Sequence, residues 1–446
     1  MKIYPDTKIY VLCPANVHTG GPESLHQLTS RLISFGLDAK ILYCARVDEP
    51  FDINDPVAPA LKKYHVPYTF DFADTSHNIF VVPEPLTEHL YAVKHCRKIL
   101  WWMSVNNYLE NILALIRPCI DSPLTEAVPK YFTFDKAGDV DEHWAKCEFV
   151  RQFLTLNGVP AKKSRHVETY MNQTFFEQAA TIDLDAKKNC VAFNPRKGFE
   201  FTKRLIELAP EIDWRPIQNM SPAQVQALLA EAKGYIDFGE HPGRDRLPRE
   251  ATVSRCVVVT GRRGAAANDI DINIPAEFKF DERTVDPQAV VDKIRAVFDN
   301  FTASLAAQEN FRQRVYDDKR NFSDTLIGAF ELKKFPPPNV ALSQGVGEES
   351  FLLAEEFFRN GELTPKFIVD DVVAATKIVD DLIVREQNRN FLRVGKNLVE
   401  VISRDDAEFL YREGRIQKFA LLDATEADVD ALKNFAAVDD VLTFTR

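Results

Sequence analysis

The chain has 446 residues, of which 45% are hydrophobic, and its formal net charge is −11. This length predicts two or three domains, and no stretch reaches the roughly 20 apolar residues of a membrane span. Residues 341–446 alone hold 21 acidic and 13 basic side chains. The excess of acidic residues, in this segment and in the whole chain, argues against the basic surface that is typical of nucleic-acid-binding proteins.

Cysteine usage and the first residues predict the cellular setting. The seven cysteines are scattered without a Cys-x-x-Cys pair, which is typical of reduced thiols in a cytoplasmic protein. The opening residues, Met-Lys-Ile-Tyr-Pro-Asp, lack the apolar core of a signal peptide. We therefore expect a cytoplasmic protein.

The chain opens with a strand, a loop, a helix and a second strand. Residues 8–13 and 39–43 are the predicted strands, and Pro22 suits the first position of the helix between them. The loop contains Gly20 and Gly21, which allow the backbone to approach a ligand closely. The order predicts a doubly wound α/β domain, and the alternative for the loop is a tight turn without a ligand.

Two further strands of this domain end in polar residues. The first strand, residues 78–82, is followed by Glu84, and the second, residues 98–105, is followed by Asn106 and Asn107. Because carboxyl ends of parallel strands meet at one edge, these residues are predicted to face the same crevice. Asn106 and Asn107 are acceptor-site candidates, with an ordinary turn as the alternative. Trp101 and Trp102 are predicted to be core residues, because both faces of such a sheet are covered.

Residues 143–157 are predicted as a helix that Gly158 ends. A second doubly wound unit begins with the strand 189–194. Its loop carries Arg196 and Lys197 before the next helix. Arginine grips phosphate with two hydrogen bonds and lysine acts as a point charge. The alternative is a solvated pair of charges beside a turn.

The most informative stretch contains two polar loops at strand ends. Residues 235–238 form a short apolar strand, and the polar loop after it carries His241 and Arg244. Pro248 is predicted as the first residue of the next helix, with Glu250 in its first turn. The buried strand 256–260 and a second polar loop, which carries Arg262, follow; both loops lie at the ligand edge of a parallel sheet.

This stretch resembles the donor-nucleotide half of a GT-B glycosyltransferase. Thr-Gly-Gly-Pro-Glu-Ser-Leu, from Thr19, also resembles the N-terminal glycine loop of that family. The resemblance is to a family 4/1-like subgroup associated with bacterial surface polysaccharide synthesis. In the commonest retaining members a second Glu precedes the ribose-binding Glu by eight positions; here that position is Pro242, which leaves the stereochemistry open.

The resemblance implies a donor site and leaves the catalytic base to be chosen. Glu250 would hold the donor ribose, and the basic residues would hold the diphosphate. His241 has the alternative role of ordering its own loop. The implied donor-binding residues are Gly20, Gly21, Arg196, Lys197, His241, Arg244, Glu250 and Arg262. An inverting reaction needs a base for the acceptor hydroxyl, and its candidates are His18, Glu23 and Glu84.

We expect no catalytic metal and no cofactor, with the nucleotide-sugar as a substrate. Asp269 and Asp271 have the spacing of a metal-binding Asp-x-Asp motif. The isoleucines that alternate with them favour an edge strand instead. No Gly-x-Gly-x-x-Gly fingerprint is present, which disfavours a dinucleotide-dependent oxidoreductase.

The resemblance implies an α/β GT-B fold, with two doubly wound Rossmann-like domains facing a cleft and a small C-terminal α/β appendage. That appendage is predicted to begin with helical residues 351–386 and to continue with strands; partner binding or oligomerisation is a hypothesis for it. The predicted parts are an acceptor-side domain (1–170), a donor-binding domain (171–315), a helix crossing back (316–335), a linker (336–350) and the C-terminal module (351–446).

The predicted function is transfer of a sugar from a nucleotide-sugar to a bacterial surface glycan or another glycan acceptor. Two alternatives stay open: a catalytically degenerate sugar-nucleotide sensor or scaffold, and a sugar-nucleotide epimerase or hydrolase. A lipid-linked acceptor would bring the protein to the inner face of the membrane. No nucleic-acid partner is expected.

Overall fold

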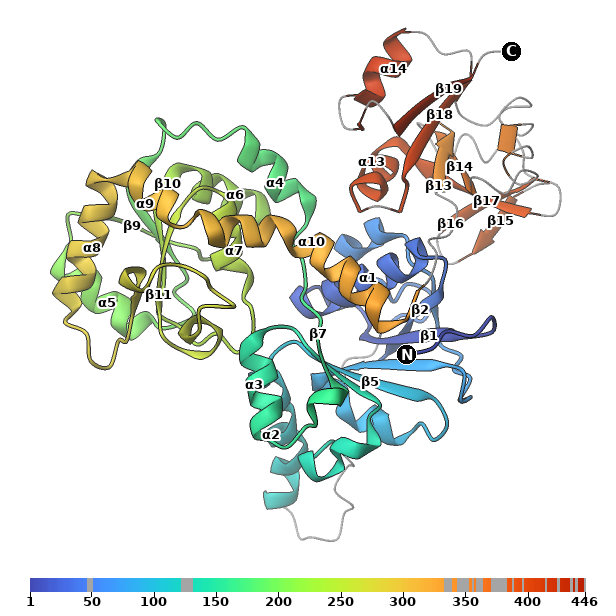
Figure 1. The fold of residues 1–446 in the computed structure, drawn as a ribbon, viewed down its shortest axis with the longest axis horizontal. Coiled ribbons are helices and arrows are strands. Elements are labelled where there is room, and N and C mark those ends of the chain that lie inside the picture. The colour runs from blue at the N-terminus through green and yellow to red at the C-terminus, as the bar shows by residue number, and fades with distance from the viewer. Residues whose placement is uncertain are drawn as a thin grey trace. The chain divides into compact units, whose positions relative to one another are not determined.

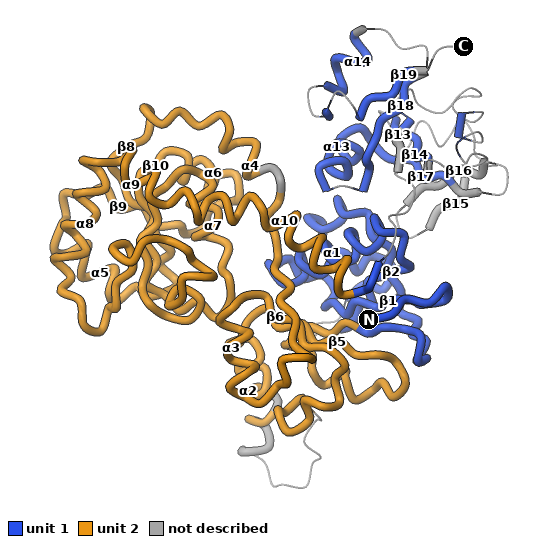
Figure 2. The backbone as a smooth tube through the Cα atoms, in the orientation of Figure 1, with its two compact units in different colours: residues 1–80, 330–446 blue, residues 81–329 orange. Residues whose placement is uncertain are grey.

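The computed structural model places helices on three sheets, which confirms the predicted α/β class (Figure 1). The chain divides into two compact units, shown in Figure 2: residues 1–80 with 330–446, and residues 81–329. The structure describes residues 1–45, 51–121, 131–332, 339–342, 353–354, 357, 364–369, 383–386, 389–394, 397–413, 415–422, 426–433, 436–437 and 440–444.

The first sheet has the strand order β3-β2-β1-β4-β5-β6-β7, and every described register within it is parallel. Its strands are β1 (Lys8–Pro14), β2 (Asp38–Cys44), β3 (Tyr68–Thr69), β4 (Ile79–Pro83), β5 (Arg97–Trp102), β6 (Glu142–Ala145) and β7 (Ser164–His166). The helices along this part of the chain are α1 (Gly20–Ser34), η1 (Pro59–Tyr64), η2 (Glu84–Tyr91), α2 (Val105–Asp121), η3 (Phe134–Asp139), α3 (Glu148–Leu156) and η4 (Ala161–Lys163).

The second sheet is wholly parallel and has the order β12-β11-β10-β8-β9. Helices α6 and α7 pack together, as do α5 and α8. The chain reverses direction across the sheet after β9, so right-handed crossovers place these pairs on opposite faces. The elements are α4 (Gln173–Ala180), β8 (Lys188–Phe193), α5 (Phe199–Leu208), β9 (Asp213–Pro216), α6 (Pro222–Glu231), β10 (Ala232–Asp237), α7 (Arg246–Val253), β11 (Val257–Gly261), η5 (Gly264–Ala267), η6 (Ala276–Phe278), β12 (Lys279–Phe280), α8 (Pro287–Asp299), α9 (Phe301–Ala307) and α10 (Glu309–Ala329).

Helix α10 joins the second sheet to β5 within residues 81–329. It packs on α7, and the ring of Phe322 stacks on Trp101 of β5 with centroids 6.3 Å apart. Trp101 and Trp102 are both fully buried, which confirms their predicted place in the core.

The predicted helix 143–157 is wrong over its first five residues. Residues 142–145 form β6, between β5 and β7, and the helix begins only at Glu148. A four-residue strand is too short to show an alternation of its own, so the apolar pattern of α3 extended over it. Lys146 and Cys147 therefore stand at the carboxyl end of a strand.

The third sheet has the order β15-β16-β17-β14-β13-β18-β19 and belongs to the unit that contains the N-terminus. Strands β15, β16 and β17 pair antiparallel to one another, and the other described strand pairs of this sheet are parallel. The elements are β13 (Asn339–Leu342), β14 (Thr364–Val369), β15 (Ile383–Glu386), β16 (Arg389–Val394), β17 (Asn397–Ser403), α13 (Arg404–Arg412), β18 (Lys418–Leu422), α14 (Glu426–Lys433) and β19 (Val441–Phe444).

The prediction of a helical segment over 351–386 is wrong at β14 and β15. Phe367, Ile368 and Val369 are buried in the sheet, where β-branched and aromatic side chains pack well. Pro365 is also unfavourable inside a helix. Strand β13 lies within the predicted linker 336–350, and the rest of that segment lies outside the described residues.

The C-terminal module contacts η1 through α13. Phe409 packs edge-on against Tyr64 with ring centroids 5.2 Å apart, and Arg415 donates to the carbonyl oxygen of His65 at 3.0 Å. His65 Nε2 lies 3.0 Å from Asp406 Oδ1. The module is therefore held on the N-terminal part of the chain by both an aromatic contact and polar contacts.

Replacing Asp406 by asparagine should lower the free energy of unfolding by about 1 kcal/mol at pH 7, because the carboxylate accepts from His65 and lies at the N-terminus of α13. Burial raises the pKa of Asp406, but the His65 hydrogen bond outweighs burial and lowers it overall. A carboxyl group whose pKa is lowered by folding stabilises the folded state at pH values above its unfolded pKa of about 4. This contribution to stability is lost as the pH falls through the pKa of the folded state. Thermal unfolding at pH 7 and pH 3 measures the difference in stability between the parent and Asp406→Asn, which should be smaller at pH 3. Exposed Asp430→Asn is the control, and an equal difference at both pH values would contradict the prediction.

Candidate active site

The carboxyl end of β10 is organised by a buried carboxylate. Asp237 accepts hydrogen bonds from the hydroxyl of Tyr235 at 2.9 Å and from the backbone N–H of Gly239 at 3.0 Å. These bonds fix the point at which the polar loop 239–245 leaves the strand.

His241 lies inside this loop and is fully buried. Its Nε2 is 3.6 Å from Asp237 Oδ1 and its Nδ1 is 3.4 Å from Asp245 Oδ2. Burial lowers the pKa of His241, but the two carboxylates outweigh burial and raise it overall. The backbone carbonyl of His241 accepts from the N–H of Ala265 at 2.9 Å. This geometry fits the alternative role of ordering the loop, and donor contact by His241 stays a prediction.

Lys197 reaches the same loop from the end of β8. Its Nζ donates to Asp245 Oδ2 at 2.7 Å and to the carbonyl oxygen of Glu240 at 3.3 Å. Burial raises the pKa of Asp245, but His241 and Lys197 outweigh it and lower the pKa. Arg196 is exposed, and among the described residues its guanidinium has no hydrogen-bond or ion-pair partner. The structure thus brings Lys197 to the loop that precedes Glu250, and Arg196 is its exposed neighbour in the chain.

Glu250 lies in α7, buried, with Oε1 3.2 Å from Arg246 Nε. The helix begins at Arg246 rather than at the predicted Pro248. Glu250 is therefore two residues further into the helix than predicted, on the element that directly follows the loop.

Arg244 is buried in a cluster of ion pairs. Its Nη1 donates to Glu168 Oε2 at 2.7 Å and also to Asp318. Arg249 donates to Asp318 Oδ2 at 3.3 Å and to the carbonyl oxygen of Thr169 at 2.8 Å. Glu168 lies in the segment after β7 and Asp318 in α10, so this cluster joins both segments to α7. The diphosphate role predicted for Arg244 stays a prediction, and its visible contacts are with carboxylates of the protein.

The second polar loop is also held by the protein itself. Arg262 donates to the carbonyl oxygens of Lys279 at 3.3 Å and Ala276 at 3.4 Å. Asp271 is buried and accepts from the backbone N–H groups of Glu148 and Phe149 at 2.7 and 2.8 Å. It therefore caps the first turn of α3.

Further contacts join the ends of β5 and β10. The N–H of Val105 donates to the carbonyl oxygen of Pro242 at 3.0 Å, and Asn106 Nδ2 donates to Glu240 Oε2 at 3.1 Å. A Cβ added at Gly243 would lie 2.3 Å from the carbonyl oxygen of Met103. Asn106 and Asn107, the acceptor-site candidates for which an ordinary turn was the alternative, belong to the first turn of α2; a role in acceptor binding stays a prediction.

Replacing Gly264 by alanine should cost about 2 kcal/mol of stability. Gly264 has φ +55°, and its added Cβ would lie 2.0 Å from the carbonyl oxygen of His241. The left-handed backbone alone costs roughly 1–2 kcal/mol for an L-residue, and the collision is with backbone. Gly328→Ala is a matched control, because nothing lies within 4 Å of its Cβ in α10 and alanine favours a helix by about 1 kcal/mol. Denaturant unfolding measures the free energy of unfolding of the two variants. Equal changes in Gly264→Ala and Gly328→Ala would contradict the prediction.

Glu84 is fully buried at the end of β4. Its oxygens accept from the N–H groups of Met103 at 2.9 Å and Ser104 at 3.0 Å, and from Asn107 Nδ2 at 3.4 Å. Burial raises the pKa of Glu84 to about 7. These contacts anchor the start of α2, and a role as base stays a prediction.

The other candidates lie in the unit that contains the N-terminus. Gly20 and Gly21 are the first residues of α1, and His18 before them is exposed. Glu23 is buried; its Oε1 accepts from the Tyr64 hydroxyl at 3.0 Å and lies 3.7 Å from Lys63 Nζ. Their catalytic and donor-binding roles also stay predictions.

Asp269 and Asp271, which have the spacing of a metal-binding motif, both have partners within the protein. Asp269 and Asp271 lie in a turn rather than in the predicted edge strand. Asp269 pairs with Lys279 at 2.9 Å, and among the described residues no group of three His, Cys, Asp or Glu could hold an ion. None of the described helices combines the length and the apolar character needed to span a membrane.

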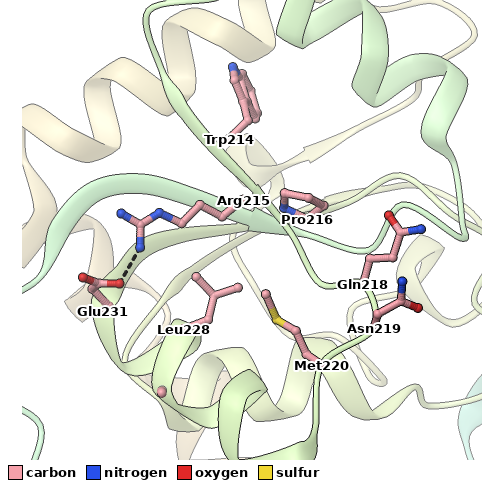
Figure 3. A pocket seen from close by; sticks show the side chains of 9 residues that line it. Trp214, Arg215, Pro216, Gln218, Asn219, Met220, Leu228 and Glu231 are labelled. Carbon is pink, nitrogen blue, oxygen red and sulfur yellow. Dashed lines mark hydrogen bonds and ion pairs between the residues drawn. The ribbon is translucent and has the colours of Figure 1, made fainter.

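A cavity of about 610 Å³ lies at β9 and α6 (Figure 3). Arg215 and Glu231 form an ion pair within it. Sequence analysis did not single it out, and none of the predicted site residues lines it. Its lining consists of Trp214, Arg215, Pro216, Gln218, Asn219, Met220, Ala227, Leu228 and Glu231.

No family model matches the sequence, and a search of curated proteins found no match. Three similar solved structures are TarM of S. aureus (TM-score 0.41, 11% identity, 60% of this chain), Anabaena HepE in complex with UDP-glucose (0.42, 12%, 72%) and the Thermosynechococcus elongatus sucrose-phosphate synthase (0.47, 13%, 72%). The chain spans 57% of TarM's length, 99% of HepE's and 98% of the synthase's. Because these TM-scores lie below 0.5, we draw the function from this chain's own residues.

Proposed function

We propose that the chain is a glycosyltransferase that moves a sugar from a nucleotide-sugar to a glycan acceptor, without a metal ion or cofactor. The observation that supports this most is the assembly at the ends of β8 and β10. Lys197 is bonded to Asp245 at 2.7 Å, beside exposed Arg196, and the same loop leads directly to Glu250 in α7.

This assembly suits the departure of a nucleoside diphosphate. Positive groups that are fixed in advance stabilise the charge that develops on the leaving group. Lys197 is fixed by two bonds to the loop, and the exposed guanidinium of Arg196 offers a bidentate grip on phosphate. Glu250 would accept hydrogen bonds from the donor ribose, as the sequence resemblance implies.

An inverting reaction would take its base from His18, Glu23 or Glu84. Of these, His18 is exposed, whereas Glu23 and Glu84 are buried and accept hydrogen bonds from the protein. His18 is therefore the base that we would replace first. A bacterial surface glycan or a lipid-linked glycan is the proposed acceptor, in the cytoplasm or at the inner face of the membrane.

A degenerate sensor or scaffold is the second candidate function. Pro242 stands where the commonest retaining enzymes carry a Glu, and Arg244 is engaged by Glu168 and Asp318. Such a protein would bind a sugar-nucleotide without turning it over. Binding and turnover must therefore be measured separately.

A thermal-shift screen against UDP-, GDP-, CMP- and dTDP-sugars, followed by an assay for nucleotide release, tests the proposal. A ligand that binds only the folded state raises the melting temperature. We expect a shift with one nucleotide class that Arg196→Ala/Lys197→Ala removes and Lys203→Ala, an exposed lysine of α5, keeps. A shift without turnover in the presence of glycan acceptors would favour the sensor, and no shift at millimolar ligand would contradict both candidates.

A further inference from the structure

Lys146 is a charged side chain at the candidate site that sequence analysis did not single out. It directly follows β6, and its backbone N–H donates to the carbonyl oxygen of Trp102 at 3.0 Å, which holds it at the carboxyl ends of β5 and β6. The next residues, Glu148 and Phe149, are capped by Asp271 from the second polar loop. Lys146 therefore lies where the two sheets of residues 81–329 approach each other.

Lys146 is half-buried as a residue, and its ammonium has no hydrogen-bond or ion-pair partner among the residues that the structure describes. Its charged neighbours come from both sheets: Arg249 and Asp245 from the second and Glu84 from the first. Both carboxylates are engaged elsewhere, since Asp245 accepts from Lys197 and Glu84 accepts from two backbone N–H groups. Withdrawing an ammonium from water without a partner is unfavourable, so this position favours an anionic ligand.

We infer that Lys146 binds the diphosphate of the nucleotide-sugar donor, opposite Lys197. The two lysines reach the neighbourhood of Asp245 from different sheets, one from the end of β6 and one from the end of β8. A diphosphate that bridges them would neutralise an ammonium for which the described part of the chain supplies no partner. This inference rests on the proposed function and adds a ligand from the first sheet to the donor site.

The lysine also gives the site a pH dependence. Burial first, and the Arg249 guanidinium second, lower the pKa of Lys146 to about 8, while Asp245, Cys147 and Glu84 act in the opposite direction. A bound diphosphate favours the charged form, so it raises the pKa of Lys146. Affinity for a nucleoside diphosphate should be maximal below pH 8 and fall above it, as the free protein loses this proton.

Calorimetric titration of the full chain with two ligands tests the inference. One ligand is the nucleoside diphosphate of the class that the thermal-shift screen selects, and the other is the matching nucleoside, which lacks the phosphates. Lys146→Gln should weaken diphosphate binding by about 10- to 100-fold, the range for a hydrogen bond between charged groups. Nucleoside binding should not change, and Lys146→Arg should restore part of the loss. The control is Lys162→Gln, which removes one positive charge from an exposed lysine in η4, between β6 and β7. This variant should bind the diphosphate like the parent.

Two further readouts separate a ligand role from a structural one. Lys146→Gln should melt without ligand at the parent's temperature or above, because the ammonium has no partner to lose among the residues whose positions are described. It should also lose the fall in affinity above pH 8. Equal diphosphate affinities of the parent and Lys146→Gln, or a ligand-free melting temperature well below the parent's, would overturn the inference while leaving the donor site intact. Absence of diphosphate binding to the parent would instead overturn the proposed function.

Discussion

Replacing Asp318 by alanine should lower the free energy of unfolding by about 3–5 kcal/mol, which is the usual cost of removing one partner from a buried ion pair. Asp318 is fully buried in α10 and accepts from both Arg244 and Arg249. Its loss would remove the carboxylate that pairs with Arg249 and leave Arg244 with Glu168 as its carboxylate partner in the described part of the chain. Denaturant unfolding monitored by circular dichroism measures the change.

The neighbouring carboxylate gives a matched control for Asp318. Asp317 lies on the same helix, is about one-third exposed and pairs with Arg320 at 3.0 Å. Because exposed pairs contribute about 0–1 kcal/mol, Asp317→Ala should be close to neutral. Similar losses from the two substitutions would show that α10 does not depend on the buried cluster.

Replacing Glu250 by alanine should weaken nucleotide binding by about 100-fold or more. The proposed function has its carboxylate accept hydrogen bonds from the donor ribose, and each bond to a charged group contributes about 1.5–3 kcal/mol, with 1.4 kcal/mol for a factor of ten. Calorimetric titration with the nucleotide selected by the screen measures the affinity.

Glu250 also pairs with Arg246, so stability must be measured beside affinity. Glu250→Gln keeps the shape of the side chain and separates the loss of charge from the loss of packing. Glu207→Ala, an exposed carboxylate of α5, is the control for net charge and should bind like the parent. Unchanged nucleotide affinity in a well-folded Glu250→Ala variant would remove Glu250 from the donor site.

The strands that carry the candidate site were predictable because buried parallel strands are continuous apolar runs that end in polar or glycine residues. Residues 189–194 and 256–260 follow this pattern, and the structure forms β8 and β11 there. The ends of these strands also located the polar loops correctly. The apolar runs and the residues that end them therefore predict the edge of the second sheet at which Lys197 and the loop 239–245 lie.

The contacts of those residues depend on distant partners and left no local signal. The cluster around Arg244 needs Glu168 and Asp318, which lie 76 and 74 positions away. Arg244 was therefore predicted only as a ligand of the donor diphosphate, and neither its burial among carboxylates nor the burial of His241 was predicted. Lys146 was missed because β6 was predicted as helix, which removed its place at a strand end.

Short or unfamiliar patterns account for the remaining differences. Asn106 and Asn107 have strong turn preferences, which concealed the start of α2. In the C-terminal module, β14 contains a proline and stands apart from any motif, so neither its type nor its partner strands followed from the local sequence. The hairpin of β16 and β17 completes a sheet whose order no local pattern specifies.

A crystal structure of the full chain with the nucleotide-sugar selected by the screen would test the donor site most directly. The account predicts the diphosphate within hydrogen-bond distance of Arg196 and Lys197, with the ribose at Glu250. A nucleotide bound instead in the cavity between β9 and α6, which contains the Arg215–Glu231 pair, would contradict the assignment of the loop 239–245 as the donor site.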